Sequence, residues 1–146
     1  MTGTVLYEVR RARSQHELAA ALELRHEVFC VEQGVPEHDE LDGRDHEGIH
    51  LVAVQDGELL GTCRIVMVGG TAQLSRLAVR ADARRRGIAT ALLDLADAET
   101  HAAHGRRIVL HAQIYARELY ERSGYRARGR VFREAGIEHI AMEKVL

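Results

Sequence analysis

Arg84, Arg85 and Arg86 stand in a row directly before Gly87. Apolar residues recur at helical spacing after this glycine, so a helix is predicted to begin there. The first turn of a helix leaves N–H groups unpaired and carries a partial positive charge, and both favour anions. Gly87 and the small Ala89 would let a phosphate approach the backbone, and arginines donate charge-assisted hydrogen bonds to phosphate. The stretch is therefore a candidate pyrophosphate site, although a solvated basic helix start explains these residues equally well.

The pattern matches neither of two common phosphate-binding loops, because the sequence contains no GxxxxGK[ST] and no GxGxxG. The surrounding elements are those that would position such a site. "AQLSRLAV" predicts a strand that ends at Val79, and the helix after Gly87 is predicted to stop at Gly105. "RIVLHAQ" predicts a further strand, "YARELYERSG" a short helix, and residues 125–146 two strands around "REAGIE".

The first half of the chain predicts one helix and a strand pair. Ser14 and Glu17 form a capping-box pattern ahead of a helical stripe that extends to Phe29. An acidic loop with the only proline follows, and then "HLVAV" and "ELLGTCRIVMV" are joined at Asp56-Gly57, a strong hairpin signal. Together the elements predict a single α+β domain over residues 1–146, built on a largely antiparallel sheet.

Composition excludes several classes of protein. The 146 residues correspond to one domain, and 20 basic against 22 acidic residues are unlike the basic excess of a general nucleic-acid binder. No apolar run approaches the ~20 residues of a membrane span, and no signal peptide is recognisable, so a cytoplasmic protein is predicted. Cys30 and Cys63 lack CxxC spacing, and the His and acidic residues between His38 and His50 lack ligand spacing. No metal site is therefore predicted.

Two motifs resemble those of the GNAT family of acyl-CoA N-acetyltransferases. The family signature Arg/Gln-x-x-Gly-x-Gly/Ala is similar to the segment from Arg84 to Ala89, which follows a strand and opens a helix. A second motif, Asn-x-x-Ala-x-x-Leu-Tyr-x-x-x-Gly-Phe, is matched at Gln113, Ala116, Leu119, Tyr120, Gly124 and Tyr125. Gln113 replaces the usual Asn, which puts its amide contact in doubt, and Tyr125 replaces the usual Phe.

Further segments from Leu24 onward resemble the bacterial branch of this family typified by the ElaA and YjcF proteins. They are "LRHEVFCVEQGVPEHDELDGRD", "LHAQIYARELYERSGY" and "FREAGIEHIAMEKVL". The resemblance implies the GNAT fold, with a central, mostly antiparallel mixed β-sheet flanked by helices. It also implies acetyl-CoA as co-substrate and direct acetyl transfer to an amine in a ternary complex, without a metal.

The resemblance also implies roles for individual residues. The strand from Leu77 to Val79 would offer backbone groups to the pantetheine arm, which would pass between this strand and "RIVLHAQ". The implied contacts to the co-substrate come from Leu77, Val79, Arg84, Arg85, Arg86, Gly87, Ala89, Thr90, Gln113 and Tyr120. Tyr120 would lie beside the sulfur as a general acid, whereas its place on an amphipathic helix also suits a core tyrosine.

The general base is less defined by the sequence. Glu32 and Glu134 are candidates because the resemblance puts both near the acceptor, and Glu32 is the preferred one. His111 is as well explained by surface exposure or packing, and a water relay would need no single base. The acidic loop, which includes Glu40 and Asp42, could also attract a cationic acceptor.

The predicted function is N-acetylation of a primary amine on a small molecule or peptide, with no nucleic-acid or membrane partner. Two other classes stay open. One is a non-catalytic acetyl-CoA-binding sensor, and the other is an acyl-homoserine-lactone synthase, whose Arg…Val-Phe start is similar to Arg25…Val28-Phe29. The acceptor and the oligomeric state are not predicted, with a homodimer as one option.

Overall fold

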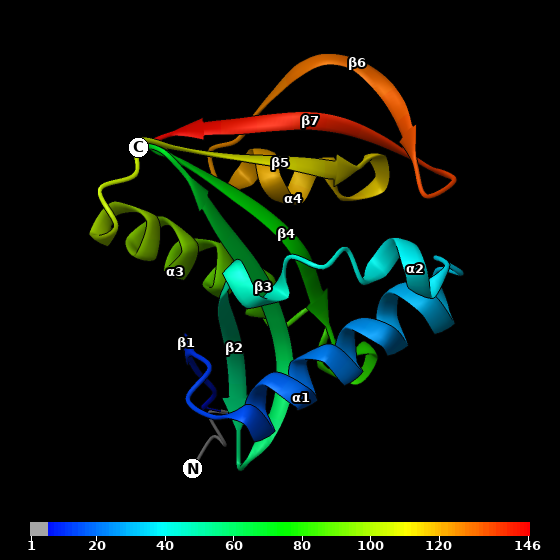
Figure 1. Cartoon of the computed structure of the whole chain (residues 1–146), viewed down its shortest axis with the longest axis vertical. Helices are drawn as coiled ribbons and strands as arrows, with labels where there is room; N and C mark the ends of the chain where they lie inside the picture. Colours follow the sequence, from blue (N-terminus) through cyan, green and yellow to red (C-terminus); the bar gives the residue numbers. More distant parts are fainter. Residues whose placement is uncertain (1–5) are drawn as a thin grey trace.

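The computed structural model describes residues 6–146, which form one mixed sheet with helices packed on it (Figure 1). The strands are β1 (Glu8–Arg11), β2 (Ile49–Gln55), β3 (Glu58–Val68), β4 (Thr71–Val79), β5 (Arg107–Gln113), β6 (Arg126–Glu134) and β7 (Ile137–Val145). The α-helices are α1 (Gln15–Arg25), α2 (Glu37–Glu40), α3 (Ile88–Ala102) and α4 (Arg117–Arg122). A π-helical segment η1 (His26–Glu32) and 3-10 turns η2 (Asp45–Glu47), η3 (Ala81–Ala83) and η4 (Ile114–Ala116) complete the order.

The sheet has the order β1-β2-β3-β4-β5-β7-β6, and β4 with β5 is its one parallel pair. The predicted α+β class, with a mostly antiparallel mixed sheet flanked by helices, is confirmed. The turn at Asp56-Gly57 forms with positive φ at both residues, as that dipeptide predicts. Edge strand β1 was not predicted, because its four residues are too short for a clear alternation.

Helices cover both faces of the sheet, and two apolar clusters fill the space between. α1 crosses in front of β3 and β4 in Figure 1, where Leu24 and Val28 pack against Ala78. The larger cluster includes Leu92 and Ile108 and joins α3 to the strands. Leu59 and Leu60, adjacent on β3, belong to different clusters, as expected when successive side chains point to opposite faces.

The first helix begins as predicted but ends differently. The Oγ of Ser14 accepts a hydrogen bond from the N–H of Glu17 at 3.1 Å, which confirms the N-cap. The predicted helix to Phe29 instead changes at His26 into the π-helix η1, which continues to Glu32. Wider π turns of this kind are frequent at functional sites. Here the segment carries Glu32 and Gln33 to the rim of the main cleft.

A buried ion network fixes the loop after η1 to the sheet. Arg25 and Glu40, 1% and 4% exposed, share two hydrogen bonds of 3.1 and 2.6 Å. Arg25 also donates to Asp45 at 2.7 Å, and Arg64 on β3 donates to both oxygens of Asp42 at 2.8 and 2.7 Å. The hydrogen bonds from Arg64 hold the pKa of Asp42 well below its usual range despite partial burial. The arginines neutralise these carboxylates, so the structure does not support Glu40 and Asp42 as an attractant for cations.

The lowered pKa of Asp42 makes its contribution to stability depend on pH. We expect Asp42→Asn to lower the free energy of unfolding by ~2 kcal/mol at pH 7, because Arg64 loses a charged partner. A group whose pKa is depressed by folding contributes fully above its unfolded pKa, about 4, and loses that contribution as pH falls through the folded value. The difference between variant and wild type should therefore shrink below about pH 4 in urea unfolding curves. Asp94→Asn, at an exposed position on α3, is the control and should change little; a difference independent of pH would contradict the assignment.

Among residues 6–146, no helix is both long and apolar enough to cross a membrane.

Candidate functional site

A cleft of about 1140 Å³ opens where β4 and β5 separate. The two strands pair only from Thr71 to Gln73, opposite Arg107 to Val109, and then diverge. Beyond Gln73, no strand in residues 6–146 pairs with β4 on the side that faces β5. The backbone groups of β4 there have no β-ladder partner. The cleft extends from the start of α3, past η4 and α4, to the β6–β7 hairpin. Different residues therefore line its two ends.

A bulge in β4 lies on the wall of this cleft. Ser75 pairs with Arg64 and Ala78 with Thr62, so one extra residue of β4 is accommodated between those pairs. Arg76 occupies the bulge with φ +59°, a conformation that costs energy for a side chain other than glycine. Its guanidinium donates to the backbone oxygen of Glu40 at 3.0 Å and to the carboxylate at 3.2 Å. The buried ion network thus holds the bulge, after which β4 leads Leu77 and Val79 along the cleft.

The start of α3 forms the anion-receptive end. Arg85 and Gly87 both have positive φ, +65° and +80°, so the chain turns sharply before entering the helix. Gly87 is the N-cap and supplies no side-chain acceptor, and the first turn of α3 carries no acidic residue. The N–H groups around Ala89 and Thr90 are therefore free of a side-chain cap and border the cleft. Because no side chain caps these N–H groups, they remain available to an anion.

The three arginines before Gly87 point to two different places. Arg84 and Arg85 line the cleft, and Arg84 also donates from Nε to the carbonyl oxygen of Val79 at 3.0 Å. Arg86 does not line the cleft. Its guanidinium donates to the Gln55 side chain at 2.9 Å and lies 6.0 Å from the centre of the Tyr7 ring. The structure thus brings together every sequence-predicted contact residue except the Arg86 side chain, which packs against β2 and the N-terminal segment.

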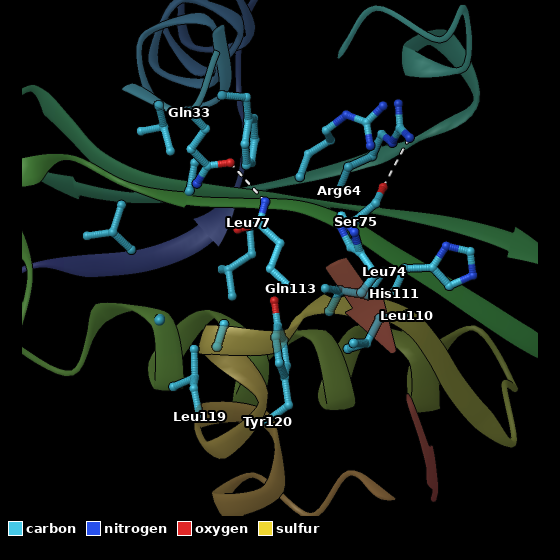
Figure 2. A pocket seen from close by; sticks show the side chains of 18 of the residues that line it. Gln33, Arg64, Leu74, Ser75, Leu77, Leu110, His111, Gln113, Leu119 and Tyr120 are labelled. Atoms are coloured by element: carbon cyan, nitrogen blue, oxygen red, sulfur yellow. Dashed lines mark hydrogen bonds between the residues drawn. The ribbon is translucent and has the colours of Figure 1, made fainter. Parts of the chain in front are cut away.

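Tyr120 lies in the middle of the cleft with its ring in the core. Its side chain is 8% exposed and meets Tyr125 edge-on, with ring centres 5.9 Å apart. Figure 2 shows the Tyr120 hydroxyl directed toward Gln113, out of the core and into the cleft. Burial raises the pKa of Tyr120, so the phenol keeps its proton at neutral pH. The ring of Tyr120 therefore packs in the core, while its protonated hydroxyl faces the cleft.

Gln113 crosses the cleft to meet the other wall. Its Nε2 donates to Oε1 of Gln33 at 2.8 Å, and Gln33 in turn donates to the Tyr115 hydroxyl at 3.1 Å (Figure 2). The side chain of Gln113 is long enough to span the cleft to Gln33. Its amide therefore links β5 to the end of η1 where the two sides of the cleft approach one another.

Glu32 borders the same end of the cleft as the arginines. Both its oxygens accept hydrogen bonds from Arg84, at 3.0 and 2.8 Å, and the two side chains are 36% and 42% exposed. The pair spans 52 residues of sequence, which no local pattern could predict. Glu32 as general base stays a prediction, with its carboxylate engaged by Arg84 in this structure.

The far end of the cleft contains a cluster of polar and aromatic side chains that was not predicted from the sequence. His111 on β5 and Glu134 at the end of β6 meet at 2.9 Å, between Nδ1 and Oε1. Phe132 packs edge-on against His111 with ring centres 4.9 Å apart, and His139 on β7 stacks on Phe132. The sequence pointed to His111 and Glu134 separately and not to Phe132 or His139, and their association depends on the register of β7 between β5 and β6. Among residues 6–146, no group of His, Cys, Asp or Glu could hold a metal ion.

Comparison with known proteins places the chain among acetyltransferases. The Acetyltransferase (GNAT) domain family matches residues 12–146. A Bacillus subtilis protein named uncharacterized N-acetyltransferase YjcF is 33% identical over 135 residues, which cover 91% of this chain and 96% of that protein. The crystal structure of an acyl-CoA N-acyltransferase from Pseudomonas aeruginosa superposes with a TM-score of 0.82 at 32% identity, covering 97% and 99% of the two chains. Escherichia coli ElaA superposes with a TM-score of 0.85 at 26% identity, covering 95% and 99%.

These matches confirm the predicted family and its ElaA/YjcF-like branch, because they span nearly the whole chain and include both named proteins. They agree with a cleft that has an anion-receptive helix start at one end and a proton-bearing tyrosine in the middle. The chain belongs to the GNAT family of acetyltransferases and is, with that family, an acetyl-CoA-dependent transferase.

Proposed function

We propose that this protein transfers the acetyl group of acetyl-CoA to a primary amine of a small molecule or peptide, by direct transfer in a ternary complex without a metal. The observation that carries the proposal is one continuous cleft. It joins the uncapped start of α3, the separated strands and the Tyr120 hydroxyl. We assign the reaction to the cytoplasm.

The residues present fit acetyl-CoA. The N–H groups at the start of α3, with Arg84 and Arg85, would hold the pyrophosphate, since all of them border the cleft. The unpaired edge of β4 near Leu77 and Val79 would hold the pantetheine arm by backbone hydrogen bonds, with Gln113 opposite. When bound, acetyl-CoA would supply an activated thioester, whose carbon an amine attacks.

The chain's own groups would then manage charge and protons. A backbone N–H beyond the bulge in β4 would polarise the thioester oxygen, as oxyanion donors do in acyl transfer. The Tyr120 Oη would give a proton to the departing sulfur, since the raised pKa keeps that hydroxyl protonated. The acceptor would enter at the far end of the cleft, near the β6–β7 hairpin, where Glu134 lines the wall.

An acceptor screen tests this function. Purified protein and acetyl-CoA would be mixed with ethanolamine, glucosamine, putrescine and a lysine-containing peptide, while free thiol is measured. We expect amine-dependent thiol release and an acetylated amine by mass spectrometry. Tight acetyl-CoA binding with no thiol release across such panels would indicate a sensor. Activity only with an acyl carrier protein and S-adenosylmethionine would indicate a homoserine-lactone synthase.

The Glu32–Arg84 pair gives a further expected result. Glu32→Gln removes a negative charge beside the proposed pyrophosphate contacts and releases Arg84 from a partly exposed ion pair. Such pairs contribute ~0.2–1 kcal/mol, so CoA should bind roughly two- to fivefold more tightly in calorimetry. Turnover should stay within a few-fold of wild type. A loss of turnover of about a hundredfold with unchanged CoA affinity would instead support Glu32 as the general base.

A further inference from the structure

The cluster at the far end of the cleft leaves one nitrogen of His111 available for chemistry. An ionised carboxylate only accepts hydrogen bonds, so the 2.9 Å contact with Glu134 requires the proton of a neutral His111 ring on Nδ1. The lone pair is then on Nε2, which has no hydrogen-bond partner among residues 6–146. Phe132 packs against the ring edge-on and restricts its orientation. The arrangement is that of a base whose tautomer is set by a carboxylate.

We infer that His111 accepts the proton of the acceptor amine and that Glu134 is the residue that positions it. This inference rests on the proposed function and deepens it, because direct transfer requires a neutral amine and most primary amines are protonated at neutral pH. Nothing in the sequence pattern alone assigns either role.

Position along β5 supports the assignment. His111 and Gln113 are two residues apart on one strand, so their side chains share a face and are separated by ~7 Å. Gln113 is the residue toward which the Tyr120 hydroxyl points, and it reaches across the cleft to Gln33 (Figure 2). Ala112, the residue between them, is buried on the other face. An acceptor that lies along this face of β5 would meet His111 at one end and Gln113, beside the proposed acid, at the other.

Three other titratable side chains that line the cleft are less suited to this role. Glu32 has both oxygens bonded to Arg84, at the end of the cleft where the pyrophosphate is proposed. Tyr120 keeps its proton because burial raises its pKa. His139 uses Nδ1 to contact the carbonyl oxygen of Ile137 at 2.7 Å and is only 6% exposed. His111, with half of its side chain exposed, can meet an acceptor that enters from solvent.

Proton transfer to His111 precedes acetyl transfer. A proton leaves the ammonium nitrogen of the acceptor and binds to Nε2 of His111, which becomes an imidazolium stabilised by the neighbouring Glu134 carboxylate. The freed lone pair attacks the thioester carbon and a C–N bond forms; the nitrogen then gives its second proton to water as the C–S bond breaks. The departing sulfur takes a proton from Tyr120 Oη, and solvent exchange restores both side chains.

Kinetics as a function of pH test the base. Glu134 on β6 contacts His111, and His139 on β7 lies 3.8 Å from the other oxygen of Glu134. We expect kcat/KM of wild type to rise with pH as the general base loses its proton. His111→Gln should lower kcat by ~10²-fold and remove that limb, with CoA affinity unchanged. His101→Gln, at an exposed position on α3, is the matched control and should leave both unchanged.

Glu134→Gln tests the positioning role. It should reduce kcat less than His111→Gln does, without changing CoA affinity. The acceptor for these assays is the panel amine with the highest thiol release. A His111→Gln protein that keeps wild-type kcat and pH dependence would overturn the inference while leaving the proposed function intact, whereas an inactive wild type would count against the proposed function itself.

A second measurement needs no acceptor. Nitrogen-15 NMR of the histidine rings distinguishes the two neutral tautomers at high pH. We expect His111 to carry its proton on Nδ1 in wild type and to shift toward the Nε2–H form in Glu134→Ala. A wild-type His111 that is mainly Nε2–H would overturn the inference, because Nε2 would then have no lone pair to offer.

Discussion

Gly87→Glu should weaken CoA binding by at least about a hundredfold, because it places a carboxylate where the pyrophosphate is proposed to bind. Two unit charges 4 Å apart near a protein surface repel with about 4 kcal/mol, more than the 2.7 kcal/mol that a hundredfold loss requires. The added side chain would also block approach to the first turn of α3. Calorimetry with CoA measures the change directly.

The backbone at Gly87 calls for a matched control. Its φ of +80° disfavours any side chain by ~1–2 kcal/mol, so both variants should unfold at lower temperature. A Cβ at this position meets only the Tyr7 hydroxyl at 3.8 Å, an ordinary contact. Gly87→Ala therefore carries the same backbone strain without the charge, and its CoA affinity should fall only a few-fold. Equal affinities in the two variants would place the phosphates elsewhere.

Tyr120→Phe should lower kcat by roughly a hundredfold and leave CoA affinity nearly unchanged. The substitution removes the proton donor but keeps the ring that packs in the core, and general acids contribute ~10²–10⁴-fold. The lower end applies because CoA is a good leaving thiol. The assay is thiol release under saturating substrates, with CoA binding and thermal unfolding measured on the same preparation.

Tyr125→Phe provides the comparison for Tyr120. The two rings meet edge-on, but the Tyr125 hydroxyl is buried without a hydrogen-bond partner in the described part of the chain, and Tyr125 does not line the cleft. Its loss should therefore leave kcat within about twofold of wild type and not reduce stability. If both tyrosine variants retained normal kcat, the sulfur would have to take its proton from water.

Local signals predicted most of the elements. Asp56-Gly57 forms its turn with positive φ at both residues, β4 ends at Val79 and α3 begins after Gly87, as predicted; α3 ends at Ala102, before the predicted stop at Gly105. The conversion of a predicted helix into η1 at His26 was not predictable in this way, because seven residues of wider i→i+5 bonding are too few to show an apolar period of their own. Arg25, directly before η1, contacts Glu40 and Asp45 in the following loop, and local spacing does not reveal such contacts.

The site was predicted where its residues are contiguous and missed where distant strands assemble it. Arg84, Arg85 and Gly87 act from one turn, so their pattern is visible in the sequence. The outward direction of Arg86 depends on Gln55 in β2, and the contact of His111 with Glu134 depends on strand register. A shift of one residue in register would turn those side chains to the opposite face, and a single sequence does not fix it.

The central claim is that the cleft between β4 and β5 holds CoA with its phosphates at the start of α3. Titration of nitrogen-15-labelled protein with CoA, followed by amide NMR, tests it without any acceptor. The account predicts that the largest shifts occur at Gly87, Ala89 and Thr90, and at Leu77 and Val79 along β4. Saturable binding with the largest shifts outside the cleft, or no binding at millimolar CoA, would contradict it.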